Sequence, residues 1–175
     1  TILPFTLEPG EEKEICVLLD NPGDAFTGIQ FDLYLPDGIS VPTDADGYYC
    51  IDLGSRTSSR KHVLPECTMK TDSTLRVLCY SNSNATFTGE NGDVLVITVV
   101  GDENLTGGVY DLKINNIVLS RPDVTNNKPA NYKASILTDA GGDVKTFVLN
   151  GIYSADVLSE FSASLAYNTK ITCID

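Results

Sequence analysis

Few side chains in this sequence are suited to catalysis. His62 is the only histidine among 175 residues, and the sequence contains no Gly-x-Ser-x-Gly elbow, phosphate-binding loop or His-Glu-x-x-His zinc motif. Glycoside hydrolysis needs only two carboxylates beside a cleft, and the 24 Asp and Glu residues supply many candidate pairs. A small fold with short loops offers little cleft, so we expect a protein that is not an enzyme.

Acidic residues around a glycine turn could bind calcium. Asp44, Asp46 and Gly47, with Asp52 downstream, cluster the hard oxygen ligands that this ion prefers. The segment lacks the third ligand position and the bidentate Glu of an EF-hand loop. An acidic surface turn is therefore the favoured interpretation, and the sequence predicts no metal or other cofactor, with calcium as the weaker alternative.

Two tyrosines in the same turn could bind a glycan. Tyr48 and Tyr49 stand beside Asp44 and Asp46. An amphipathic Tyr ring can stack on a sugar, and the carboxylates could hydrogen-bond it. The alternative is that one of the two rings packs against the edge of the fold.

The one basic cluster lies in a loop-like segment and comprises Arg56, Arg60, Lys61 and His62. Either it meets an acidic partner, or it is a solvated loop that balances nearby carboxylates, and we expect the second. His62 is accordingly predicted to be a solvated side chain at the entry to a strand.

Period-2 alternation separates the two faces of two predicted strands. The side chains predicted to point into a core are Ile29, Phe31, Leu33 and Leu35 in the first strand, and Leu75, Val77 and Cys79 in the second. The side chains left on the outer face are Gln30, Asp32, Tyr34, Arg76, Leu78 and Tyr80. Exposed Tyr and Arg are common recognition residues, although Tyr is also simply a good strand former. If this face binds a protein, we expect it to be exposed and largely apolar at its centre.

Asp32 is the most constrained of these outer residues. An unpaired buried carboxylate would cost several kcal/mol, so Asp32 must face outward or join a hydrogen-bonded pair. We expect Asp32→Ala to change stability by no more than about 1 kcal/mol, and Phe31→Ala to cost about 3–5 kcal/mol through the cavity it leaves.

Short strand-like segments separated by turn residues account for most of the chain. They are residues 15–19, 29–35, 63–69, 75–80, 94–100, 110–119 and 132–137. This pattern predicts an all-β fold, an antiparallel β-sandwich or jelly roll. The apolar run 94–100 predicts a central strand with both faces covered, and a phase slip across Asn115-Asn116 predicts a β-bulge or a simple irregularity.

The pattern changes after Gly141-Gly142. A strand is predicted at 146–149, and Ser154 then introduces apolar residues at helical spacing up to Ala166, followed by a second strand-like run. We therefore divide the chain into a sandwich over 1–143 and a short C-terminal strand-helix-strand extension over 144–175.

Five cysteines are scattered without a Cys-x-x-Cys pair, which argues against a disulfide scaffold and a structural zinc site. A three-residue loop at Asp72-Ser73-Thr74 would place Cys67 opposite Cys79, close enough to bond. A two-residue loop at Asp72-Ser73 would break that register.

Two motifs carry a resemblance to a known family. The first is Phe26–Val41, FTGIQFDLYLPDGISV, with its Gly-Ile entry, Gln-x-Asp strand and Pro-Asp-Gly-Ile exit; the second is Asn91-Gly92-Asp93 followed by an apolar strand. Over roughly Thr1 to Asp143 the chain resembles the cohesin-like β-sandwich modules, related to carbohydrate-binding modules, of secreted and cell-surface proteins, notably from Bacteroidetes-type bacteria. The extension after residue 143 is similar to the start of the repeat-like regions that follow such modules.

The resemblance implies a secreted or cell-surface binding or scaffolding module. In cohesins the matching strand carries an outward amide-x-Asp pair that helps to bind a dockerin helix, and Gln30 and Asp32 look like that pair with Gln in place of Asn. A glycan-binding module and a structural spacer remain as alternatives. The formal net charge of −12 disfavours nucleic acid and anionic membranes as partners. No apolar run reaches the ~20 residues of a membrane span. We expect a monomer.

Overall fold

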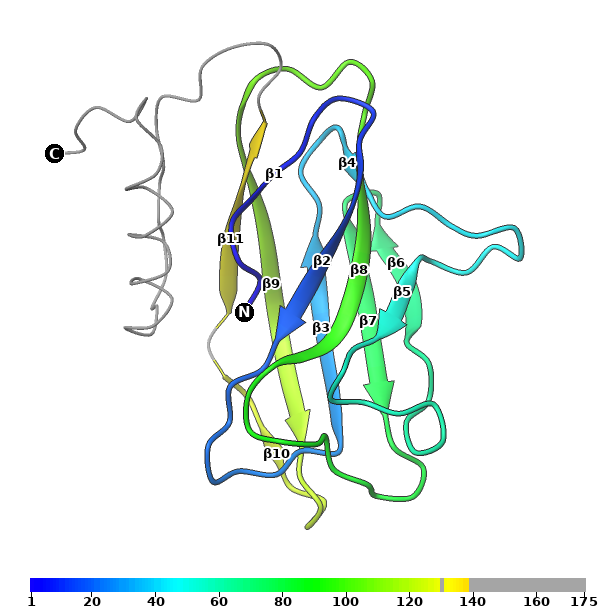
Figure 1. The fold of residues 1–175 in the computed structure, drawn as a ribbon, viewed down its shortest axis with the longest axis vertical. Helices are drawn as coiled ribbons and strands as arrows, with labels where there is room; N and C mark the ends of the chain where they lie inside the picture. The colour runs from blue at the N-terminus through cyan, green and yellow to red at the C-terminus, as the bar shows by residue number, and fades with distance from the viewer. Residues whose placement is uncertain (130, 139–175) are drawn as a thin grey trace, which may run out of the picture.

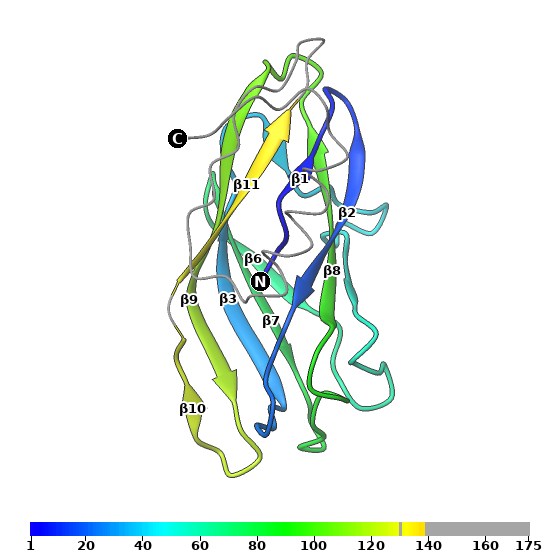
Figure 2. The ribbon, with the colours of Figure 1, turned by 60° about the vertical axis from the view of Figure 1, so that its left-hand side comes forward.

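The computed structural model describes residues 1–129 and 131–138, which form two β-sheets packed face to face (Figures 1 and 2). The larger sheet has the strand order β1-β11-β9-β3-β7-β6, with β10 beside β9. Its strands are β1 (Phe5–Thr6), β3 (Gly28–Tyr34), β6 (Glu66–Thr71), β7 (Thr74–Tyr80), β9 (Gly108–Ser120), β10 (Asn126–Asn127) and β11 (Tyr132–Thr138).

The smaller sheet has the order β2-β8-β4, with β5 also paired to β8. Its strands are β2 (Glu12–Leu18), β4 (Ile39–Ser40), β5 (Ile51–Leu53) and β8 (Asp93–Gly101). The pairings of named strands are antiparallel except that of β1 with β11, which is parallel. The predicted all-β antiparallel sandwich is therefore confirmed.

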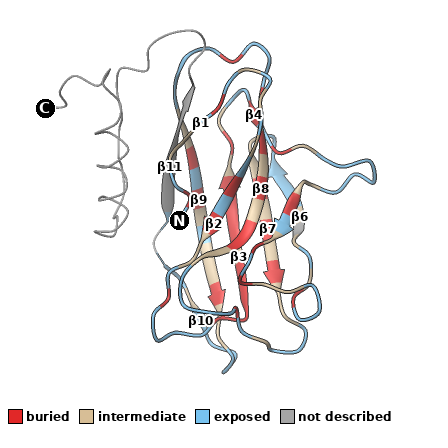
Figure 3. Cartoon of the chain, in the orientation of Figure 1, coloured by how far each residue is buried: buried red, intermediate tan, exposed pale blue. Residues whose placement is uncertain are grey.

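The core lies between the two sheets and follows from the alternation along each strand (Figure 3). Phe31 and Leu33 of β3 and Val77 of β7 have exposed fractions of 0%. Leu95, Ile97 and Val99 of β8 meet them from the smaller sheet and are equally buried. Burying alternate apolar side chains from both inner faces is what stabilises a sandwich.

The seven predicted strands are all present, and four short ones were missed. β1, β4, β5 and β10 have only two or three residues each, too few for a period-2 pattern to emerge. β8 is central, as predicted, since it has partners on both sides. Its outer-facing Val96 and Val100 are only half-buried, so the expectation that both faces are covered was wrong.

The β6–β7 hairpin decides the disulfide question. Thr71 pairs with Thr74, so the loop is Asp72-Ser73, and Cys67 lies opposite Val77 instead of Cys79. Both thiols are free. The two-residue loop is the alternative that the structure adopts, and Cys67 and Cys79 are not bonded.

The basic cluster is not the solvated loop that we expected. Arg60 and Lys61 are exposed, but the exposed fractions of Arg56 and His62 are 3% and 4%. The Arg56 guanidinium donates to the carbonyls of Leu19, Thr88 and Gly89 and to the side chain of Asn21. A buried cation is tolerable here because oxygen acceptors surround it.

His62 has a structural place as well. Its Nδ1 accepts a hydrogen bond of 3.2 Å from the Ser58 backbone N–H, and its ring stacks on Phe87 with centroids 5.2 Å apart. The ring thus helps to close the loop that precedes β6.

The predicted C-terminal strand-helix-strand extension lies outside the described residues, as does the proposed boundary at 143. Within the part that is described, no helix has the length and apolar character of a membrane-spanning segment.

Candidate binding face

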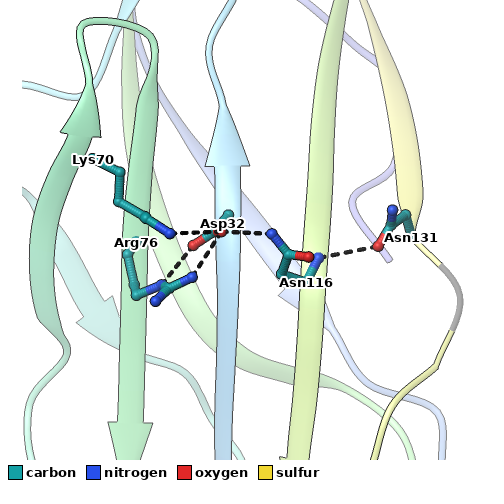
Figure 4. A network of polar contacts seen from close by, with 5 residues as sticks. All are labelled: Asp32, Lys70, Arg76, Asn116 and Asn131. Carbon is teal, nitrogen blue, oxygen red and sulfur yellow. Dashed lines mark hydrogen bonds and ion pairs between the residues drawn. The ribbon is translucent and has the colours of Figure 1, made fainter.

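An ion pair stands at the centre of the outer face of the larger sheet (Figure 4). Asp32 of β3 lies directly opposite Arg76 of β7 in the strand register. The guanidinium donates from Nε to Asp32 Oδ1 at 2.7 Å and from Nη2 to Oδ2 at 2.9 Å. This bidentate geometry is the strongest form of carboxylate pairing in proteins and fixes both side chains.

Two further residues complete the shell of Asp32. Asn116 of β9 donates from Nδ2 to Asp32 Oδ2 at 2.8 Å, and its backbone N–H donates to Asn131 Oδ1 at 3.0 Å. Lys70 of β6 places Nζ 3.7 Å from Asp32 Oδ2. The network thus joins β6, β7, β3 and β9 across the face, as Figure 4 shows.

The bulge in β9 is what brings Asn116 to this site. The β3–β9 register shifts between Gln30 and Asp32, and Asn116 has a left-handed φ of 52°. Asn tolerates this conformation better than most residues. The register shift lies at the phase slip across Asn115-Asn116, where a bulge or a simple irregularity was predicted, and it has a consequence for the site.

The shell explains how Asp32 can be charged although it is only 3% exposed. Hydrogen bonding by Arg76 lowers the pKa of Asp32 below its usual value; burial opposes this, and Asn116 and Lys70 reinforce it. The same hydrogen bond raises the pKa of Arg76. Both partners are therefore ionised at neutral pH.

Aromatic and aliphatic side chains flank the ion pair. Tyr34 lies one row from it, and Lys113 holds its ammonium 5.2 Å from the centre of the Tyr34 ring, a cation–π distance. On the other side Gln30 pairs with Leu78 and with Val118, and Tyr80 follows along β7. These four residues are all half-buried.

The structure therefore brings together the five predicted face residues, Gln30, Asp32, Tyr34, Arg76 and Tyr80, on two adjacent strands. One expectation was wrong. We expected an exposed face that is apolar at its centre. The centre is instead the buried carboxylate of Asp32, which is covered by the cations Arg76 and Lys70, because the strand pairing places Arg76 directly opposite Asp32.

Lys70, Lys113 and Asn116 were not among the residues predicted from the sequence. A signal existed for Asn116, because the Asn115-Asn116 slip marks an irregularity in the strand. Lys70 had none: a regular hairpin with the loop Asp72-Ser73 would pair it with inward Leu75, and only the register shift between Met69 and Thr71 changes this. The pairing of β9 with β3, which assigns Asn116 and Lys113 to this face, has no local signature.

The candidate glycan loop is a tight projecting turn. Asp44 Oδ1 accepts backbone N–H groups of Asp46 and Tyr48 at 2.9 Å. Tyr48 is 73% exposed, whereas Tyr49 is half-buried and packs against the core, as one of the two alternatives held. Two cavities of about 530 and 520 Å³ in the described part lie elsewhere, and neither is lined by these tyrosines.

Asp44 has a structural task in this turn, because its Oδ1 accepts two backbone N–H groups, and the acidic turn and the calcium loop both stay predictions. Among the described residues, no three His, Cys, Asp or Glu side chains converge as the ligands of one metal ion.

Comparisons with known proteins identify the fold. No family model matches the sequence, and no curated protein matches it. Among solved structures, the seventh type I cohesin of ScaB from Pseudobacteroides cellulosolvens is similar, with 16% identity, a TM-score of 0.62, and coverage of 85% of this chain and 96% of that one.

A cohesin–dockerin complex and a surface protein give the same result. The type I cohesin–dockerin complex from Clostridium thermocellum aligns at 12% identity and a TM-score of 0.62, covering 79% of this chain and 96% of that one. The type III cohesin module of the cell-surface anchoring scaffoldin ScaE from Ruminococcus flavefaciens aligns at 13% identity and a TM-score of 0.57, covering 79% and 86%. At these identities the comparison shows a cohesin-like fold.

Proposed function

We propose that the chain is a non-enzymatic binding or scaffolding module of a secreted or cell-surface bacterial protein, and that it recognises a dockerin-like protein partner. The recognition surface is the outer face of β6, β7, β3 and β9, which we call the binding face. It comprises Gln30, Asp32, Tyr34, Lys70, Arg76, Leu78, Tyr80, Lys113, Asn116 and Val118.

The observation that carries the proposal is the fixed polar network around Asp32. A bidentate pair braced by Asn116 holds Arg76 in one geometry, and preorganised side chains lose less entropy on binding. Half-buried Tyr34, Tyr80 and Leu78 surround it, and Tyr and Arg are the residues most often found at binding hot spots. Solved cohesins of this fold include one in complex with a dockerin.

The test uses a variant that blocks the face without changing its charge. Gln30 lies between Leu78 and Val118, so Gln30→Trp adds bulk at the centre, and Trp is well tolerated in strands. Immobilised wild-type and Gln30→Trp proteins are exposed to the extracellular fraction of the source bacterium. A partner retained by the wild type and lost by the variant supports the proposal; equal retention contradicts it.

A second candidate function is glycan binding at Tyr48, because this ring is 73% exposed on a turn that Asp44 stiffens. A glycan array of the wild type and Tyr48→Ala tests it. Signals that disappear in Tyr48→Ala would favour the glycan function. Silence in both the array and the pull-down is the result expected of a structural spacer.

A further inference from the structure

The binding face differs in charge from the rest of the molecule. The whole chain carries a formal charge of −12. This face contains three cations, Lys70, Arg76 and Lys113, and one carboxylate, Asp32. A second carboxylate, Asp111, borders it along β9. The register adds one residue of each sign, Glu66 opposite Leu78 and Lys133 opposite Lys113.

The outer face of the smaller sheet has the opposite character. Glu12 and Glu14 of β2 and Asp52 of β5 are exposed there, beside the outward residues of β8. The positive charge on the binding face is thus local and is concentrated around Asp32.

Asp32 has little capacity left for a partner. Its two oxygens already accept three hydrogen bonds, two from Arg76 and one from Asn116, and only 3% of the residue is exposed. Its role is to position Arg76. A guanidinium has five N–H groups, so Arg76 keeps donors beyond those that the pair uses.

Lys70 and Lys113 are the accessible charges of the face. The side chain of Lys70 is 42% exposed although its ammonium is near Asp32. Lys113 is exposed, and its ammonium lies over the Tyr34 ring in a cation–π contact. Asp111 lies two residues from Lys113 along β9.

We propose that the partner surface that meets this face bears carboxylates, which pair with Lys70, Arg76 and Lys113, while apolar partner side chains contact Leu78, Val118 and Tyr80. Charge complementarity of this kind selects partners and fixes their register. The inference rests on the proposed function and specifies the chemistry of the partner. A second copy of the chain is a poorer occupant, because two chains of charge −12 repel each other.

The probe is a phage-displayed library of random peptides selected on the immobilised full chain. The affinities of the enriched peptides are then measured for the wild type, Gln30→Trp, the pair Lys70→Glu and Lys113→Glu, and the control pair Arg60→Glu and Lys61→Glu. Arg60 and Lys61 are exposed in the loop that precedes β6 and do not belong to the binding face, and both double variants make the chain more acidic by the same amount. The control double variant therefore changes the long-range electrostatic field of the chain as much as the Lys70→Glu/Lys113→Glu double variant does.

We expect peptides rich in Asp and Glu next to apolar residues. Their affinity should fall roughly tenfold or more in the Lys70/Lys113 pair, stay within about twofold in the Arg60/Lys61 pair, and be lost in Gln30→Trp.

Other results would overturn the inference in distinguishable ways. If the peptides lose affinity for Gln30→Trp but bind the Lys70→Glu/Lys113→Glu double variant normally, the face still binds protein, but the partner is not acidic. Peptides that bind Gln30→Trp normally, or no enrichment at all, would contradict the proposed function as well. Sedimentation of the chain alone is the last arm: a dimer that dissociates in the Lys70/Lys113 pair would make a second copy the occupant.

Discussion

At the scale of single residues, Asp32 shows how a strand can hold a charge in a nearly buried position. Its side chain points away from the core, as alternation requires, yet Arg76, Asn116 and Lys70 cover it. An outward or a paired carboxylate was predicted from the alternation, and the structure shows both together.

Burial changes the expected cost of removing this carboxylate. Asp32→Ala would leave Arg76 and Asn116 without their acceptor, but both can turn towards water, so we expect a loss of about 1–2 kcal/mol in the free energy of unfolding. Phe31→Ala, next to it but inside the core, should cost about 3–5 kcal/mol. Urea unfolding of both variants measures the two losses in the free energy of unfolding. A larger loss for Asp32→Ala would show that Arg76 and Asn116 cannot turn towards water.

The Asp32 pair also predicts a pH dependence. Its pKa is lowered in the folded state, so its contribution to stability is fully present above the unfolded pKa of about 3.9 and is lost as pH falls through the folded pKa. Asp32→Asn should therefore be less stable than the wild type at about pH 7, with a gap that narrows below about pH 4.

Urea unfolding across this range measures that gap. Asp93, whose pKa is lowered mainly by a hydrogen bond from the Ser55 side chain, keeps its own acid sensitivity in the variant and serves as the internal reference. A difference in the free energy of unfolding that does not change with pH would show that ionisation of Asp32 does not contribute to stability.

At the scale of elements, the β9 bulge links local backbone chemistry to the binding face. Asn116 supplies a left-handed residue and the hydrogen bond to Asp32. The two contributions can be separated by substitution.

Asn116→Gly keeps the backbone conformation and loses the hydrogen bond, whereas Asn116→Ala loses the bond and strains the backbone. We expect Asn116→Ala to be less stable than Asn116→Gly by about 1 kcal/mol, despite the greater unfolded-state entropy of glycine. Thermal unfolding compares the two. Equal stability would mean that the bulge relaxes without cost.

The β6–β7 hairpin makes a second prediction, on thiol chemistry. Cys16 is exposed, and burial, Asp93 and Glu14 raise the pKa of its thiol. Burial raises the pKa of Cys67 and of Cys79 to about 11. In the native protein an alkylating reagent should reach Cys16 before Cys67 and Cys79, and these two should react only after unfolding in urea without reductant. If these two stayed unlabelled until reductant was added, they would be bonded and the hairpin register would be wrong.

At the scale of the whole molecule, Arg56 ties three connections together. Its guanidinium reaches the segment after β2 at Leu19 and Asn21, and the segment before β8 at Thr88 and Gly89. With the connection between β5 and β6 that carries Arg56 itself, these are three loops that are distant in sequence and close one end of the sandwich.

Replacing Arg56 should therefore be costly. Arg56→Met leaves several buried oxygens without donors, and we expect a loss of about 3 kcal/mol or more, whereas Arg60→Met at an exposed position should stay within about 0.5 kcal/mol. Chemical denaturation gives both values. A small loss for Arg56→Met would mean that water replaces the guanidinium.

What the sequence determined was local. Period-2 alternation set which residues of β3 and β7 face the core, and the Asn115-Asn116 slip located the bulge, because both signals lie within a few residues. The resemblance in Phe26–Val41 also pointed to the fold that the solved cohesins share.

Only the tertiary structure decided what those side chains meet. Asp32 reaches Arg76 across 44 positions of sequence and Asn116 across 84, and strand pairing over such separations leaves no local pattern. For the same reason Arg56 and His62, polar residues in an irregular loop, gave no sign that they are buried. Alternation depends on the chain's own geometry, whereas burial and pairing depend on which distant segments pack against it.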